Sequence, residues 1–304
     1  MRLLTRSDFD GLACAALLKE VGVIDNWKFV HPKDIQDGLV DVTDNDVLAN
    51  IPYVKGCNMW FDHHSSESER LGSGIDFKGE SRLAPSAARI IYEYYGGVAK
   101  LGHFDEMIVA VDAVDSGNLS IDDILNPTGW VLLGFMMDPR TGLGRWRQFR
   151  ISNYELMEIL IESCRTMKIA EILENQDVKE RMGVYFEQNE LFKDMLLKHT
   201  TTDGNVILTD LRGVDPIYTG NRFLIYSLFP AQNISIWAVD GRGKQNCPIA
   251  VGHSILNRTS KTDVGKILFS YGGGGHRQVG TCQVDYDDAD RVLRELIEKM
   301  KSDG

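Results

Sequence analysis

Short apolar runs alternate with longer helical stretches near the start of the chain. The runs at 3–4, 47–49 and 59–61 are bounded by turn or acidic residues, as buried strands are. The stretches 12–21 and 86–95 have the length and composition of helices. Because strands that alternate with helices form a parallel sheet under a cover of helices, the pattern predicts an α/β fold with helices on both faces of a parallel sheet.

A change in composition divides the rest of the chain. Residues 153–199 are rich in Glu, Lys, Leu and Met and contain no proline, which favours consecutive helices. After the stretch TTDG, the runs NVILTD, ISIWAVD and PIAVGHSIL are typical of strands, with helices around Phe223 and Val264 and at 289–300. We therefore predict one domain over 1–150, a helical linker over 151–200 and a smaller α/β domain over 201–304.

The charge of the chain limits the partners that it can bind. The formal net charge is −11 at pH 7, and binding to long nucleic acids depends on many Lys and Arg contacts to phosphates. We therefore expect no long nucleic acid partner, and a phosphate-bearing substrate is expected to be small. No apolar stretch reaches the roughly 20 residues of a membrane span, and no signal-peptide pattern opens the chain, so we predict a cytoplasmic protein without a membrane partner.

Acidic and imidazole residues follow three apolar runs, at points where we expect strands to end. These residues are Asp8, Asp10, Asp62, His63, His64, Asp112 and Asp115. Residues two apart on an extended chain face the same way, so Asp8 and Asp10 are expected to reach one centre beyond the sheet. Neighbouring carboxylates repel one another unless a cation lies between them, and Mn²⁺ and Mg²⁺ accept oxygen and imidazole ligands. The pattern predicts a divalent-metal site, although a DxD pair alone more often caps a helix.

A glycine run near the end of the chain is the second candidate site. SYGGGGHRQVG places four glycines before a histidine and an arginine, and NRTSKTDVG lies upstream. Glycine lets a backbone approach an anion closely, so this segment predicts phosphate binding, with a glycine-rich hairpin or linker as the alternative. The candidate contacts are Arg258, Ser260, Gly273, Gly274, Gly275 and His276.

The stretch MMDPRTGLGRW carries Arg140, Arg145 and, just after it, Arg147. We expect a loop ahead of the helical stretch. It either reaches the predicted site or is solvated or placed between domains, and the residue pattern leaves these alternatives open.

The ordered segments SDFDG, FDHHSSE, VDSG and GGGGH resemble the DHH phosphoesterase superfamily, in the branch with a C-terminal DHH-associated domain. The resemblance covers nearly the whole chain. It implies a parallel-sheet domain that holds one or two Mn²⁺ ions and a smaller domain that closes over the cleft to grip substrate. Members of this superfamily include nano-RNases, cyclic-dinucleotide phosphodiesterases, RecJ-type exonucleases, exopolyphosphatases and inorganic pyrophosphatases.

The resemblance also implies roles for single residues. The implied metal ligands are Asp8, Asp10, Asn50, His63 and Asp115, with Asp46 and Asp112 as alternatives for the third and the last. Asp62 would support His63, and His64 would contact a phosphate. The glycine motif and His276 would grip substrate, helped by Arg258.

Two positions depart from the family pattern. A histidine ligand commonly precedes the DxD pair, and Arg6 stands in the nearest corresponding place, where it cannot ligate a cation. Asn50 follows the strand that usually ends in an aspartate, whereas Asp46 begins that strand. We therefore hypothesise one tightly held metal ion, with Arg6 either in the space of the lost ligand or in contact with a substrate phosphate.

These features predict an Mn²⁺-dependent phosphodiesterase or phosphatase that acts on short oligonucleotides or on linear or cyclic dinucleotides. Mg²⁺ or another divalent cation is an alternative to Mn²⁺. An exopolyphosphatase or inorganic pyrophosphatase is the second enzymatic reading, and a catalytically impaired nucleotide sensor is the third. The sequence leaves open whether the protein forms a homodimer.

Overall fold

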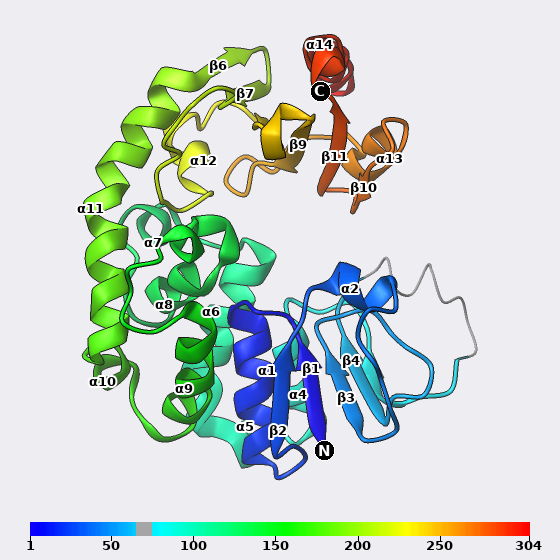
Figure 1. Cartoon of the computed structure of the whole chain (residues 1–304), viewed down its shortest axis with the longest axis vertical. Helices are drawn as coiled ribbons and strands as arrows, with labels where there is room; N and C mark the ends of the chain where they lie inside the picture. Colours follow the sequence, from blue (N-terminus) through cyan, green and yellow to red (C-terminus); the bar gives the residue numbers. More distant parts are fainter. Residues whose placement is uncertain (65–74) are drawn as a thin grey trace. The chain divides into compact units, whose positions relative to one another are not determined.

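The chain folds into two compact units. The computed structural model describes residues 1–64 and 75–304. The first unit comprises Met1–Asn118 and Asn126–Phe186, and the second comprises Leu119–Leu125 and Glu187–Gly304. Helix α11 (Gln176–His199) continues from the first unit into the second (Figure 1). This division falls inside a helix and not at residue 150 or 200. The predicted boundaries of the two domains and the linker therefore stay a prediction.

The sheet of the first unit is parallel, as the alternating pattern predicts. Within the described residues it has five strands in the order β2-β1-β3-β4-β5. The strands are β1 (Arg2–Thr5), β2 (Asn26–Phe29), β3 (Asp46–Ala49), β4 (Met59–Asp62) and β5 (Lys78–Ser81). Thr5 pairs with Ala49, and Ala49 pairs with Phe61, so β1, β3 and β4 end side by side. Their carboxyl ends form the edge at which the site is built.

Helices cover both faces of this sheet, so the predicted fold class is confirmed. On one face Leu4, Leu48 and Trp60 pack with Ile35 of the short helix α2 (Pro32–Gln36). On the other face Phe61 contacts Tyr94 at the end of α4 (Ala87–Tyr94), with ring centroids 5.2 Å apart.

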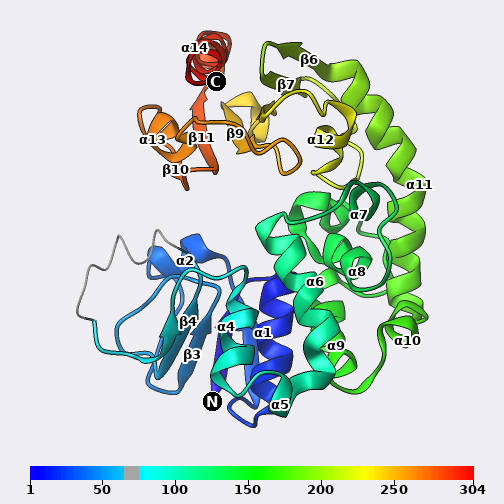
Figure 2. The same ribbon diagram turned by 180° about the vertical axis from the view of Figure 1, so that it is seen from behind.

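Helix α1 (Phe9–Glu20) is buried on all sides over most of its length. Its residues from Phe9 to Leu18 are buried, because it lies against the sheet, α4 and α9 (Asn153–Thr166) at once (Figure 2). The described residues of this unit also form the α-helices α5 (Val98–Leu101), α6 (Asp105–Ser116), α8 (Gly129–Met137) and α10 (Ile169–Leu173). The predicted consecutive helices between 153 and 199 are therefore confirmed.

The second unit is a mixed sheet with helices. Within the described residues the order of its six strands is β10-β11-β9-β8-β7-β6. The elements are β6 (Thr200–Asp203), β7 (Val206–Asp210), β8 (Ile234–Ala238), β9 (Asn246–His253), β10 (Gly274–Gly275), β11 (Val279–Asp285), α7 (Ile121–Leu125), α12 (Leu224–Leu228), α13 (Val264–Phe269) and α14 (Ala289–Asp303). The three predicted strands are present. The sequence analysis missed β6, β10 and β11, which carry polar residues, glycines or only alternate apolar residues.

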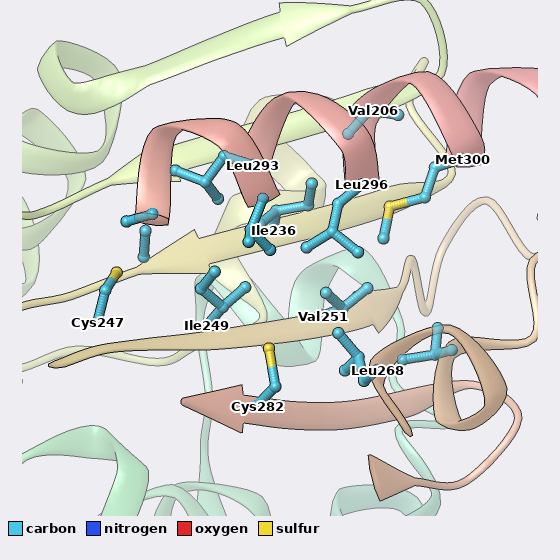
Figure 3. Packing of buried hydrophobic residues seen from close by; sticks show 14 of the residues in the cluster. Val206, Ile236, Cys247, Ile249, Val251, Leu268, Cys282, Leu293, Leu296 and Met300 are labelled. Carbon is cyan, nitrogen blue, oxygen red and sulfur yellow. The ribbon is translucent and has the colours of Figure 1, made fainter. Parts of the chain in front are cut away.

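The core of the second unit lies between its sheet and α14. Leu293, Leu296 and Met300 of that helix are buried against Ile236 and Ile249 of the sheet (Figure 3). The alternating burial of β9 follows from one face of the strand packing against this helix. Among the described helices, none has the length and hydropathy needed to cross a membrane.

Candidate functional site

Asp8 and Asp10 lie where β1 turns into α1. Asp8 is the N-cap of the helix, and its Oδ1 accepts a hydrogen bond from the Gly11 amide at 3.0 Å. Gly11 is required in this turn because a Cβ there would lie 1.9 Å from the Arg6 carbonyl oxygen. Asp10 is in the first helical turn, so the prediction that both aspartates share an extended segment is wrong. Both carboxylates are nevertheless buried at the same end of β1.

The N-terminus of α4 holds the Asp10 carboxylate. The backbone amides of Ala87 and Ala88 donate to Asp10 Oδ2 and Oδ1 at 3.0 and 2.8 Å. Burial still raises the pKa of Asp10 well above its usual value, and the charges of Asp115 and Asp8 add to this effect, while the two amides oppose it. The arrangement therefore favours a cation beside Asp10.

His63 points its second ring nitrogen at two carboxylates. Its Nδ1 lies 3.3 Å from the Ala84 carbonyl oxygen, which can only accept, so Nδ1 donates there and Nε2 is the ring nitrogen left to face the site. Nε2 lies 3.3 Å from Asp115 Oδ2 and 3.8 Å from Asp10 Oδ2. It is buried and has no hydrogen-bond partner in the part of the chain that the structure describes. The Nε2 atom of His63 thus faces two carboxylates, an arrangement that suits a bound cation.

Three potential metal ligands therefore lie close together. One donor atom each from Asp10, His63 and Asp115 lies within 4.8 Å of the other two. One imidazole and two carboxylates form a donor set for a divalent first-row ion or Mg²⁺. Asp115 comes from α6, so the expectation that it follows a strand is wrong, but the structure brings it to the predicted place.

Asp8 has partners of its own beside this cluster. Arg6 Nε lies 3.0 Å from Asp8 Oδ2, and Asn50 Nδ2 donates to Asp8 Oδ1 at 3.1 Å. Asn50 directly follows β3 in the left-handed region, with a φ of 56°. Burial raises the pKa of Asp8, and the Arg6 charge opposes this shift. A guanidinium and an amide thus surround the carboxylate that the resemblance assigns to a metal.

Asp62 supports His64 rather than His63. Its buried carboxylate accepts from His64 Nδ1 at 2.9 Å and from the His64 amide at 3.2 Å. The Ala84 carbonyl orients His63 instead, so the predicted role of Asp62 needs this correction. Burial alone would lower the pKa of His64, but its hydrogen bond with Asp62 and the nearby carboxylate charges raise it.

The two alternative ligands lie elsewhere. Asp46 begins β3, at the opposite end of the strand from Asn50, and pairs with Arg2 Nε at 2.6 Å. Asp112 accepts from Ser86 Oγ at 2.7 Å and from Arg89 Nε at 2.8 Å. Asp112 therefore fastens the start of α4, whose amides bind Asp10.

The structure adds Arg140 and Asp138 to the site. Both line one pocket together with Asp8, Asp10 and Asp115. The sequence analysis left Arg140 undecided because nothing in a loop sequence shows what it packs against. The acidic residue two positions earlier was the available signal.

The predicted phosphate contacts belong to the second unit. Arg258 Nε donates to the Ile255 carbonyl at 2.9 Å, and Ser260 Oγ is buried without a partner in the described part of the chain. The glycine run forms a hairpin in which Gly274 pairs with Thr281 and Gly275 with Gly280. The Gly273 and His276 amides donate to the Leu268 and Val279 carbonyls, so these two amides serve the fold. The roles of the side chains stay a prediction.

Solved structures resemble the chain over its whole length. No protein-family model and no curated protein matches it. A pGpG-specific phosphodiesterase, PggH from Vibrio cholerae, is 47% identical, with a TM-score of 0.84 over 100% of this chain and 99% of that one. A DHH domain from a member of a ribosomal protein family is 13% identical, with a TM-score of 0.59 over 99% and 86%.

RecJ from Thermus thermophilus in complex with Mn²⁺ shares the fold at 13% identity, with a TM-score of 0.50 over 98% of this chain and 52% of that one. At 13% identity these last two structures show a shared fold and nothing about function. The likeness at 47% identity spans both proteins almost completely. By its fold, its site and this relative, the chain belongs to the DHH phosphoesterase superfamily.

Proposed function

We propose that this protein is a divalent-metal-dependent phosphodiesterase that hydrolyses a linear guanine dinucleotide with a 5′-phosphate, pGpG. The observation that carries the proposal is the buried Nε2 of His63, which has no hydrogen-bond partner among the described residues and faces Asp10 and Asp115. The choice of substrate rests on the 47%-identical relative, which is a pGpG-specific phosphodiesterase. In the proposed reaction one water is consumed, the bond from phosphorus to the 3′ oxygen breaks, and two molecules of 5′-GMP are released.

Asp10, His63 and Asp115 would hold one ion, and we propose Mn²⁺. The mixed oxygen and imidazole set suits it, and fixing Nδ1 on the Ala84 carbonyl keeps Nε2 available as a ligand. When bound, such an ion supplies Lewis acidity at a phosphoryl oxygen and activates water at neutral pH.

We expect His64 to contact a phosphate of the substrate. Asp62 fixes its ring through Nδ1, so Nε2 is the atom through which His64 would contact a phosphoryl oxygen. The two histidine rings lie with their centroids 4.2 Å apart, so this contact would lie next to His63, the proposed metal ligand. Asp62 acts as a positioning residue for it.

The experiment is a substrate panel with purified protein and Mn²⁺. We expect mononucleotide release from pGpG to exceed turnover of cyclic di-GMP, pyrophosphate and polyphosphate. His63→Ala should abolish both Mn²⁺ binding and turnover, whereas His103→Gln, which changes an exposed histidine, should alter neither. Phosphate release from polyphosphate with pGpG left intact would instead support the exopolyphosphatase reading.

If the protein were a catalytically impaired nucleotide sensor, a different result would be expected. A sensor would bind pGpG tightly and leave it intact after prolonged incubation with Mn²⁺. The group of Asp10, His63 and Asp115, which could hold one ion, supports catalysis over sensing. A cytoplasmic location remains part of the proposal, and light scattering of the purified protein would decide whether it is a homodimer.

A further inference from the structure

The loop after α8 is built as a rigid support for Arg140. Asp138 is buried and accepts a hydrogen bond from the Arg140 amide at 2.9 Å, which closes the turn Pro139–Thr141. Thr141 Oγ1 donates to the Phe135 carbonyl at 2.6 Å and ties the turn back to the helix. Because both ends of the turn are fastened, the backbone at Arg140 has a defined position.

The guanidinium of Arg140 is held on one side only. Its Nε donates to Asp138 Oδ1 at 2.7 Å. Within residues 1–64 and 75–304, Asp138 is the one residue with which this side chain forms a hydrogen bond or ion pair. The side chain is 46% exposed, so its outer nitrogens Nη1 and Nη2 can donate hydrogen bonds to a ligand from solution. A carboxylate that fixes Nε leaves the planar fork of an arginine directed for a bidentate contact.

Arg140 lines the same pocket as the metal cluster. That pocket is also lined by Asp8, Asp10, Asp115 and Asp138. Burial alone would lower the pKa of Arg140, but the charges of Asp138, Asp8 and Asp115 raise it, so the guanidinium is charged in this setting. An arginine at this place would lie next to a phosphate bound by a metal ion at Asp10 and Asp115.

The balance of charge in the pocket supports this role. The lining carboxylates are Asp8, Asp10, Asp115 and Asp138, and Arg140 and Arg6 are the guanidiniums that pair with two of them. A single divalent ion would neutralise the remaining two carboxylates. The pocket is then neutral before a phosphodiester binds, and the outer nitrogens of Arg140 can donate charged hydrogen bonds to its phosphate.

We propose that Arg140 is a substrate-binding residue that grips a phosphate group of the dinucleotide with Nη1 and Nη2, while Asp138 positions it. This inference rests on the proposed function, because it assumes a phosphoester substrate at the Asp10, His63 and Asp115 cluster. It assigns the loop after α8 to the substrate site. Hydrogen bonds from a charged donor to phosphate are worth about 1.5–3 kcal/mol, which corresponds to roughly 10- to 150-fold in affinity.

The test compares Arg140→Ala and Arg140→Lys with Arg147→Ala, which removes an exposed arginine from the same stretch. We expect Arg140→Ala to raise KM for pGpG by about 10- to 100-fold with unchanged Mn²⁺ stoichiometry. Arg140→Lys should recover only part of the loss, because a lysine lacks the fork. Asp138→Asn should give an intermediate KM, and Arg147→Ala should match the wild type.

A second measurement keeps this inference separate from the proposed function. Calorimetry with inorganic phosphate in the presence of Mn²⁺ reports anion binding whether or not any nucleotide is hydrolysed. Weaker phosphate binding by Arg140→Ala or Arg140→Gln, each with a wild-type circular dichroism spectrum, would support the role of Arg140 even if pGpG were not the substrate. Phosphate affinity and KM within twofold of the wild type in both variants would overturn it.

Discussion

Arg6 Nε lies 3.0 Å from Asp8 Oδ2, so a guanidinium neutralises the first aspartate of the DxD pair. The other oxygen of this carboxylate accepts from Asn50 and from the Gly11 amide. A histidine and an aspartate at the positions of Arg6 and Asn50 would supply two further ligands, as the family pattern does. We therefore propose that Arg6 and Asn50 stand in this chain where the family has ligands of a second metal position.

The first prediction concerns the number of metal ions. We expect one Mn²⁺ ion per wild-type chain after gel filtration, measured by plasma mass spectrometry. The double variant Arg6→His/Asn50→Asp should bind a second ion, because it removes the positive charge beside Asp8 and adds two ligands. Two stoichiometric ions in the wild-type protein would contradict this reading.

A second prediction tests how α4 supports the metal ligand. Ser86 caps α4 through the Arg89 amide, and Ser152 caps α9 in the same way. Replacing either serine with alanine should cost about 1 kcal/mol of unfolding free energy, measured by urea denaturation. Only Ser86→Ala should also weaken Mn²⁺ binding, by about tenfold, because the amides of this helix start hold Asp10. Equal Mn²⁺ affinities in the two variants would show that the cap serves stability alone.

A third prediction links metal, pH and stability. Burial raises the pKa of Asp10 in the metal-free protein above its unfolded value. A carboxyl with a raised pKa stabilises the fold at acid pH, and this contribution is lost as the pH rises through the folded pKa. Mn²⁺ must displace that proton, so the gain in Tm on adding Mn²⁺ should grow from acid to neutral pH. Asp10→Asn should flatten the trend, and a gain independent of pH in the wild type would count against it.

A fourth prediction separates structural from binding glycines. A Cβ at Gly273 would lie 2.2 Å from the Thr281 carbonyl oxygen, whereas a Cβ at Gly274 would have nothing within 4 Å. We expect Gly273→Ala to destabilise the second unit by more than about 2 kcal/mol and Gly274→Ala to change stability by less than about 0.5 kcal/mol, as thermal unfolding would show. If Gly274→Ala still raises KM for pGpG, the predicted substrate role of the glycine run gains support.

The sequence by itself determined the class of fold and the kinds of ligand. Alternating apolar runs and helical stretches are local properties, so they predict the parallel sheet and the strand end at which Asp8 and His63 lie. The sequence also showed that Arg6 and Asn50 stand where the family that it resembles has ligands, because comparing motifs needs only the residue types.

The tertiary structure decided which acids meet. Asp112 and Asp115 are separated by less than one turn of α6, yet one pairs with Ser86 and the other with His63. The donors to Asp10 are backbone amides, which have no signature in residue type, and Arg140 reaches the pocket through a loop whose neighbours lie far away in sequence. Contacts of this kind depend on how helices pack, and no local pattern records that packing.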